Sequence, residues 1–327
     1  MPPRVSFVVP CYNYSRYLPE CLQSILTQNA AVDFEVIVID DGSTDDTWEI
    51  IRGFDDPRIR PIRHRTNQGH AATVNEGLGQ ARGDFIARID PDDRYRPGFL
   101  TVTLERFAAC PQAGLVYGDV CLIDQRGEVT AERSDRQHNG RDFVGNEFLE
   151  LLERNFICSP TVIARGQVWR AVPPVPDHLA FHDWYFTVMM ARAHDFCYVN
   201  TVLAEYRVHP MNHHGRIVRD RSEETSLFWL LDRLFKEAEP RPELEQRKQR
   251  ARRRIYGAQY LTLADKYFGF AMTDDARRCY LRAVGFQPAY LLRADVLRHL
   301  AGALIGQGRY ERVKAAAKAL RRVRSVN

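Results

Sequence analysis

The chain has 327 residues, of which 45% are hydrophobic and 27% are charged, and its formal net charge is +4. A chain of this size and composition can bury a full core, as one large domain with an appendage or as two domains. No stretch approaches the roughly 18 uninterrupted apolar residues of a membrane helix, and the N-terminus runs into a strand pattern without a signal peptide, so we expect a cytoplasmic protein. The seven cysteines are scattered and never spaced as Cys-x-x-Cys, which argues against a disulfide framework or a zinc ribbon.

Charge is distributed unevenly along the chain. Residues 241–327 carry 20 Lys and Arg against 7 Asp and Glu, so this segment has a balance of +13 and the first 240 residues a balance of −9. A basic segment on an acidic body can contact nucleic acid, anionic lipid or the body itself, or it can form a solvated helical face. Composition leaves these alternatives open.

Strand and helix patterns alternate over the first third of the chain. Short apolar runs that end in proline or acid predict buried strands, and apolar residues at i, i+3, i+4 and i+7 predict helices between them. The expected strands are 5–9, 34–40, 59–62 and 85–90, and the expected helices are 16–26, 71–81 and 97–110. Because β-α-β crossovers are right-handed, this alternation predicts a parallel, doubly wound α/β sheet.

The alternation breaks down after residue 110, which favours a mixed second half of the sheet with antiparallel additions. Extended segments are expected at 114–117, 120–123, 196–199 and 203–208, and helices at 146–154 and 182–192. From Ser222 onward nearly everything reads as helix. Residues 276–288 resemble the second helix of a tetratricopeptide-type repeat, but fewer than three units are visible, so we expect a helical appendage.

Three carboxylates stand together at the end of the fourth expected strand. Pro91 has no N–H for the sheet ladder, so Asp90, Asp92 and Asp93 should cluster at the carboxyl end of that strand, where ligands bind in open α/β sheets. A hard cation such as Mg2+ or Mn2+ would relieve their repulsion and bridge to phosphates. The alternative is a turn whose aspartates cap the next helix.

Five short motifs follow one another at expected strand ends and turns. They are Pro10-Cys11-Tyr12-Asn13, Asp40-Asp41-Gly42-Ser43, Asn67-Gln68-Gly69, Asn75-Glu76-Gly77 and Asp90-Pro91-Asp92-Asp93. In this order they resemble glycosyltransferase family 2, and the resemblance covers roughly residues 4–215. It implies the fold called GT-A, an α/β doubly wound mixed sheet, with a nucleotide-sugar-binding half at 1–118 and an acceptor-binding half at 119–220. The helical pattern after these halves predicts a C-terminal helical region at 221–327.

The resemblance also implies roles for individual residues. Uracil is the commonest base in the family, so the expected donor is a UDP-sugar and the expected cofactor is Mn2+ or Mg2+. Asp92 would bind the cation together with Asp90 and His209, whereas Val74 stands where the family often has an arginine. The expected nucleotide-sugar-binding residues are Pro10, Tyr12, Asn13, Asp40, Asp41, Asn67, Gly69, Asn75, Asp90 and Arg207.

Asp183, at the start of an expected helix, stands where the family usually shows Glu-Asp. The resemblance makes Asp183 the general base that deprotonates the acceptor hydroxyl, with His182 in place of the usual glutamate. The alternative is a helix N-terminal carboxylate that complements the helix dipole. Residues 167–171 lack the Gln-x-x-Arg-Trp motif of processive synthases, so transfer of single sugars is expected.

These features predict a metal-dependent, inverting transferase that moves a sugar from a nucleoside diphosphate to a hydroxyl of a glycan or lipid-linked acceptor, with no nucleic acid partner. One rival is a sugar nucleotidyltransferase, which should carry a Gly-rich, basic phosphate loop after the first strand. The other is a degenerate transferase domain that serves as a binding module. The basic tail, with Lys314, Lys318, Arg321, Arg322 and Arg324, suggests peripheral contact with an anionic membrane.

Overall fold

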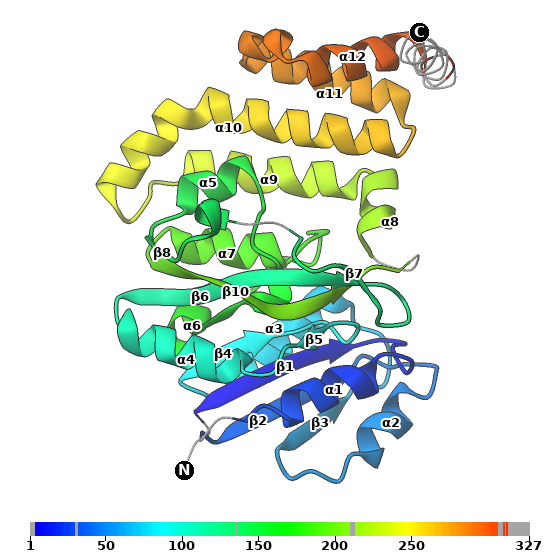
Figure 1. Cartoon of the computed structure of the whole chain (residues 1–327), viewed down its shortest axis with the longest axis vertical. Helices are drawn as coiled ribbons and strands as arrows, with labels where there is room; N and C mark the ends of the chain where they lie inside the picture. Colours follow the sequence, from blue (N-terminus) through cyan, green and yellow to red (C-terminus); the bar gives the residue numbers. More distant parts are fainter. Residues whose placement is uncertain are drawn as a thin grey trace, which may run out of the picture. The chain divides into compact units, whose positions relative to one another are not determined.

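The computed structural model describes residues 4–29, 32–134, 137–209 and 213–306, together with 310 and 312 (Figure 1). The chain divides into two compact units. Unit 1 comprises Met1–Leu151 and Asn155–Asn212, and unit 2 comprises Leu152–Arg154 and His213–Asn327. The domain limits at 118 and 220 stay predictions. Among the described residues no helix is both long and apolar enough to cross a membrane, and all seven cysteines are free.

Unit 1 is built on one ten-stranded sheet with the order β3-β2-β1-β4-β9-β6-β10-β5, to which β7 and β8 add at β6 and β10. β1, β2, β3 and β4 are parallel, β6 is parallel to β10, and β5, β7, β8 and β9 pair antiparallel. The strands are β1 (Val5–Cys11), β2 (Phe34–Asp40), β3 (Ile59–Arg63), β4 (Phe85–Arg88), β5 (Arg94–Tyr95), β6 (Ala113–Ile123), β7 (Val129–Ala131), β8 (Phe143–Gly145), β9 (Ile163–Arg165) and β10 (Asp195–Arg207).

Helices alternate with these strands. They are α1 (Leu18–Leu26), α2 (Thr47–Gly53), α3 (His70–Gln80), α4 (Phe99–Ala109), α5 (Phe148–Glu153), α6 (Gly166–Ala171) and α7 (Asp183–Ala191), with the 3-10 turns η1 (Gln137–Gly140) and η2 (Ser159–Thr161). The buried faces of α1 and α4 pack with the fully buried strands β1 and β2 into the main apolar core. The expected doubly wound mixed α/β sheet is therefore confirmed.

The second half of the sheet is more continuous than the sequence indicates. The segments expected at 114–117 and 120–123 form the single strand β6, and those expected at 196–199 and 203–208 form most of β10, whose register against β6 shifts near Val202. The reason lies at Gly118, where a Cβ atom would come within 2.7 Å of both the Thr201 carbonyl oxygen and the Leu203 side chain. Glycine therefore lets the two strands run past each other without interruption.

Unit 2 is helical. It contains α8 (His213–Arg219), α9 (Ser222–Lys236), α10 (Pro242–Gly269), α11 (Thr273–Phe286), η3 (Pro288–Leu292) and α12 (Ala294–Ile305). Its core is formed by side chains from α10, α11 and α12, including Tyr267, Tyr280 and Leu300. The expected C-terminal helical region is confirmed, whereas the basic tail residues 314–324 lie outside the described residues.

Candidate active site

The carboxyl ends of β1, β2, β4, β6 and β10 lie at one edge of the sheet, because these strands run in the same direction. At the β1 end, Pro10 is buried and Tyr12 is 42% exposed. Asn13 has a φ of 59°, and its side-chain oxygen accepts from the Thr44 N–H at 2.8 Å. The loops after β1 and β2 are thereby held together, and Tyr12 stays available at the surface.

Asp40 and Asp41, at the end of β2, are both buried. Asp40 accepts from the Ser43 N–H at 3.0 Å. Asp41 accepts from the Gln68 and Gly69 N–H groups at 2.8 and 3.0 Å and contacts His64 at 2.6 Å. The structure therefore uses both aspartates to order the loops that surround the strand ends.

His64 lies between two carboxylates. Its Nδ1 is 2.6 Å from Asp41 and its Nε2 is 2.8 Å from Glu76 in α3. Burial alone would lower the pKa of His64, but the hydrogen bonds to Asp41 and Glu76 raise it above its ordinary value. The ring then donates from both nitrogens as an imidazolium and fixes Asp41 to α3.

Two other expected residues lie farther along the same region. Asn67 is exposed in the loop before α3, next to Gly69, which has a φ of 94° and ends that loop. The amide of Asn75 pairs with the backbone of Val175, donating to its carbonyl and accepting from its N–H, each at 2.9 Å. Asn75 thus ties α3 to the proline-rich loop before α7.

The acidic segment after β4 forms a tight turn in which the Asp93 N–H donates to the Asp90 carbonyl at 3.1 Å. The capping alternative is wrong, because α4 begins only at Phe99 and has no side-chain cap. Arg88 donates to Asp90 at 2.7 Å. Burial would raise the pKa of Asp90, but Arg88 and His70 outweigh it and hold the pKa well below its usual range.

Asp92 and His209 meet although 117 residues separate them: Asp92 Oδ2 lies 3.0 Å from His209 Nε2, and both side chains are at least nine-tenths buried. Beside them Asp93 accepts from the Arg207 N–H, while its Oδ2 is buried without a hydrogen-bond partner. Burial, and then Asp92 and Asp90, raise the pKa of Asp93 well above its usual range. Three carboxyl groups are therefore crowded into one turn.

The described residues contain no group of three or more His, Cys, Asp or Glu side chains arranged to hold a metal ion. A protein-only cage is thus not formed. Asp92 and His209 do supply one oxygen and one nitrogen at a single point, next to the orphaned Asp93 oxygen. Mg2+ and similar cations commonly take one or two protein ligands and complete their shell with water and substrate phosphates. These residues fit such a substrate-linked cation.

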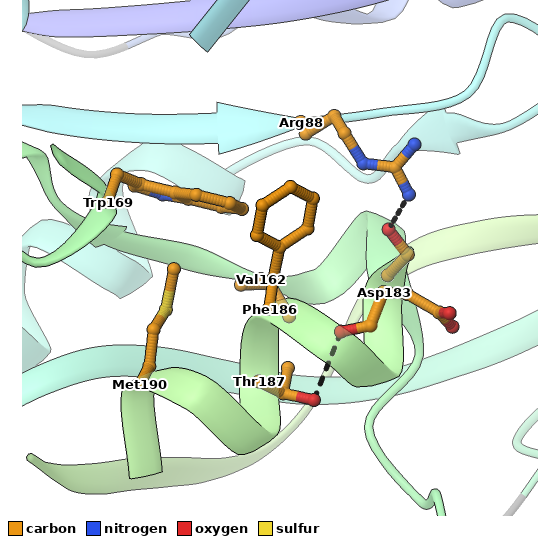
Figure 2. A pocket seen from close by; sticks show the side chains of 8 residues that line it. Arg88, Val162, Trp169, Asp183, Phe186, Thr187 and Met190 are labelled. Atoms are coloured by element: carbon orange, nitrogen blue, oxygen red, sulfur yellow. Dashed lines mark hydrogen bonds between the residues drawn. The ribbon is translucent and has the colours of Figure 1, made fainter. Parts of the chain in front are cut away.

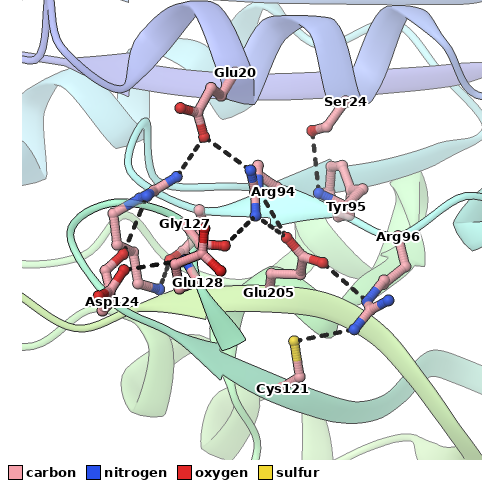
Figure 3. A network of polar contacts seen from close by, with 12 residues as sticks. Glu20, Ser24, Arg94, Tyr95, Arg96, Cys121, Asp124, Gly127, Glu128 and Glu205 are labelled. Atoms are coloured by element: carbon pink, nitrogen blue, oxygen red, sulfur yellow. Dashed lines mark hydrogen bonds and ion pairs between the residues drawn. The ribbon is translucent and has the colours of Figure 1, made fainter. Parts of the chain in front are cut away.

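Arg207 holds the turn from within the protein and shares the partly exposed Glu20 with Arg94, whose polar contacts Figure 3 shows. Its Nε donates to the Asp92 carbonyl at 2.8 Å, its Nη1 to a further carbonyl at 3.2 Å and its Nη2 to Glu20 at 2.7 Å. Arg94 contacts the same Glu20 and donates to Glu205 in β10 at 2.7 Å. Because all three guanidinium nitrogens of Arg207 have protein acceptors, this side chain acts as framework here.

A small pocket joins the acidic turn to α7. It is lined by Arg88, Ser159, Val162, Trp169, Asp183, Phe186, Thr187 and Met190. Figure 2 shows Arg88 and Asp183 at one end, and Trp169 and Met190 at the other. Arg88 Nη2 donates to Ser159 at 2.6 Å, while its Nη1 holds Asp90. The pocket therefore has one polar and one apolar end, and its polar end reaches the turn through Arg88.

Asp183 is the first residue of α7, where the helix dipole favours a carboxylate. Asn155 Nδ2 lies 3.4 Å from its Oδ2. The preceding His182 stacks on His70 with ring centroids 4.6 Å apart, and its buried Nδ1 has no hydrogen-bond partner among the described residues. Burial, then His70 and Arg88, lowers the pKa of His182 to about 3, so this ring is neutral at physiological pH.

Three contributors to this region were not expected from the sequence. Arg88 had a local signal, since a charged residue inside an apolar strand must find a partner. His64 and Glu20 had none, because each is an ordinary polar residue whose partner comes from a distant segment.

Comparisons with known proteins agree with this architecture. Residues 6–165 match the model of the family Glycosyl transferase family 2. An uncharacterized glycosyltransferase of Nostoc is 27% identical over 68% of this chain and 70% of its own length. A Campylobacter jejuni GalNAc(5)-diNAcBac-PP-undecaprenol beta-1,3-glucosyltransferase is 30% identical over 47% of this chain, which spans about half (53%) of that relative.

The crystal structure of Staphylococcus aureus TarS residues 1–349 in complex with UDP-GlcNAc superposes with a TM-score of 0.54 and 18% identity, over 92% of this chain and 79% of that one. This likeness extends the comparison to the fold of most of the chain. On the family match and the relatives, residues 6–165 of this chain form a glycosyl transferase family 2 domain, the domain of a glycosyltransferase.

Proposed function

We propose that this chain transfers single sugars from a nucleoside diphosphate sugar, with UDP as the nucleotide, to a hydroxyl of a glycan or lipid-linked acceptor, with inversion. The observation that carries the proposal is the contact of Asp92 with His209 beside Asp90, at the sheet edge where α/β proteins bind ligands. UDP is favoured because the TarS crystal structure holds UDP-GlcNAc, and a lipid-linked acceptor because the Campylobacter relative is named for an undecaprenol-linked one.

The nucleotide would lie against the loops after β1 and β2. Tyr12 is exposed there and can stack on the base, and Asn67 is exposed in the facing loop. The hydrogen bond from the Gly69 N–H to Asp41 would hold these loops in the shape that receives the nucleotide. The remaining expected donor residues, Pro10, Asn13, Asp40, Asn75, Asp90 and Arg207, would act mainly by holding these loops and the acidic turn in place.

Asp92 and His209 would hold Mn2+ or Mg2+, with Asp90 next to them. Bound there, the cation would neutralise the charge that develops on the leaving diphosphate. The crowding of three carboxylates supports this assignment, because a cation relieves their repulsion and the desolvation of the orphaned Asp93 oxygen.

Asp183 would act as the general base from the polar end of the pocket. Its carboxylate accepts the proton of the acceptor hydroxyl, the hydroxyl oxygen forms a bond to the anomeric carbon, and the bond from that carbon to the diphosphate oxygen breaks. The bonding electron pair leaves with the diphosphate, so one displacement inverts the anomeric centre. Arg88, which holds Asp90 and lines the same pocket, would keep the acidic turn in register with this base.

A matched pair of variants tests these roles. A screen of nucleotide sugars for Mn2+- or Mg2+-dependent hydrolysis first identifies the donor. Asp183→Asn should then lose transfer by about 100-fold or more while still binding UDP and Mn2+, because only proton transfer is removed. Asp92→Asn should lose Mn2+ binding, followed by the ion's electron paramagnetic resonance signal. Full sugar transfer by either variant would refute its assigned role.

The proposed location is the cytoplasm, with peripheral contact at the membrane. The basic tail suggested for that contact lies outside the described residues.

A further inference from the structure

Large apolar side chains are exposed mainly in one short part of unit 2. Ten such side chains are exposed among the described residues, and six of them fall within residues 281–305. The six are Leu281, Leu291, Leu292, Leu297, Leu304 and Ile305, and Leu292 is the most exposed at 87%. Such a concentration marks an interaction surface more often than chance exposure of single residues does.

Three of these residues, Leu297, Leu304 and Ile305, lie on α12, the last helix labelled in Figure 1. Val296, Leu300 and Ala303 point into the core of unit 2 and are at least nine-tenths buried. The opposite face presents exposed residues at helical spacing, namely Ala294, Leu297, Arg298, Ala301, Leu304 and Ile305. We call this set, together with Leu291 and Leu292 just before the helix, the α12 face. The helix is therefore apolar on both sides, although only one side packs against other described residues of unit 2.

The described part of the tail does not cover the α12 face. Tyr310 packs edge-on against Phe268 of α10, with ring centroids 5.4 Å apart, and it crowds Gly302, a buried position of α12. Tyr310 therefore lies toward the buried side of the helix, and the α12 face keeps the exposure given above.

The part of the sequence that contains the α12 face is rich in basic residues. Residues 281–327 contain ten Lys and Arg but only two Asp and Glu. Arg298 is exposed within the α12 face itself, and Arg293, which forms an ion pair with Asp295, lies at its start. An apolar face bordered by arginines is the pattern of a helix that lies in a membrane interface, where leucines enter the acyl region and arginines meet lipid phosphates.

We propose that the α12 face docks unit 2 onto the surface of an anionic phospholipid bilayer. Charge favours this occupant over a second copy of the chain. In a two-fold dimer through this face, the exposed Arg298 of each copy would approach the same positively charged face of the other, and like charges would repel. An anionic lipid surface instead attracts the same residues while the leucines leave water. The inference deepens the proposed lipid-linked acceptor, but its test does not depend on sugar transfer.

The test is flotation of the full chain with vesicles of phosphatidylethanolamine and phosphatidylglycerol, compared with vesicles of phosphatidylcholine alone. The wild-type chain should bind the anionic vesicles and be partly released by salt, which screens the arginines. Leu297→Ser/Leu304→Ser should weaken this binding by about tenfold, because two leucines that would be partly buried in the lipid no longer contribute apolar surface. The control Val129→Ser/Val144→Ser changes two similarly exposed apolar residues of unit 1 and should bind as wild type.

A charge variant guards against a folding artefact of the serine pair. Arg298→Glu leaves every leucine in place and should weaken binding to the anionic vesicles with less dependence on salt. Circular dichroism checks that all variants stay helical, and UDP binding checks unit 1 separately. The proposal would be overturned if the wild-type chain did not bind vesicles, or if both α12 variants bound them as tightly as the wild-type chain. Light scattering that shows a dimer broken by Leu297→Ser/Leu304→Ser would instead establish the second copy as occupant.

Discussion

Replacing Arg88 separates a positioning role in the active site from a structural role in the sheet. The guanidinium of this residue, which is 4% exposed, donates from Nη1 to Asp90 at 2.7 Å and from Nη2 to Ser159 at 2.6 Å. Lysine in its place keeps the charge but has one terminal nitrogen, so it cannot bridge both acceptors in the same geometry. Arg88→Lys should therefore loosen Asp90 relative to the pocket that contains Asp183.

The size of the effect follows from the bond that is lost. A hydrogen bond to a charged group contributes about 1.5 to 3 kcal/mol, and the lower end applies because the Asp90 side chain is 33% exposed. A loss near 1.4 kcal/mol in transition-state stabilisation corresponds to about a tenfold fall in kcat/KM. Arg88→Met removes the charge as well and should cost about 100-fold, because Asp90 then lacks its guanidinium partner.

The assay measures kcat and KM for the donor sugar identified by the nucleotide-sugar screen, at saturating Mn2+. Arg165→Lys is the matched control. Arg165 lies on the neighbouring strand β9 and donates to the carbonyls of residues 111 and 113, far along the chain from the acidic turn. The Arg165→Lys variant should be less stable than wild type but should keep the wild-type kcat/KM. A folded Arg88→Lys protein with wild-type kcat/KM would refute the positioning role.

Two further predictions concern stability. Hydrogen bonds to Asp41 and Glu76 raise the folded-state pKa of His64, so its contribution of about 1 to 2 kcal/mol should be complete below about pH 6.5 and disappear as pH rises through the folded pKa. The difference in urea unfolding between wild type and His64→Gln should therefore be larger at pH 6 than at pH 9. An unchanged difference at both pH values would show that the ring is neutral. Lys248 is fully buried and forms an ion pair with Glu239 at 2.6 Å, so Lys248→Met should lower the free energy of unfolding by about 3 to 5 kcal/mol. Adding Glu239→Gln should restore much of that free energy, because it removes the unpaired carboxylate. A loss below about 1 kcal/mol in Lys248→Met would contradict the assigned ion pair.

The position of the candidate site at one edge of the sheet could be predicted, because the sequence patterns that indicate it are local. Each of Asp40 and Asp90 follows an apolar run that can only be a buried strand, and parallel strands joined by right-handed crossovers end at the same edge. The signal for the helix that begins at Asp183 was equally local. The strand order, by contrast, was not readable, since β9 inserts between β4 and β6 from a segment that lies after both in sequence.

The partners within the site depend on contacts that no local pattern encodes. Arg207 meets Glu20 across 187 residues, and His209 meets Asp92 across 117. The same limit explains the two continuous strands β6 and β10. Their patterns break at Gly118 and at the shift near Val202, and only the pairing of one strand with the other shows that each break is a close approach within a single strand.

The arrangement of charge at the acidic turn connects the framework to the proposed chemistry. Arg88 is occupied by Asp90, and Arg207 donates from all three guanidinium nitrogens to protein acceptors. Neither arginine beside the turn is therefore available to a diphosphate without breaking buried hydrogen bonds, each of which is costly to leave unmade. A donor diphosphate at this edge would face Asp92 and Asp93 with no guanidinium between them. In the proposed reaction the diphosphate would therefore need a separate positive charge there, and the Asp92–His209 pair is where a divalent cation would supply it.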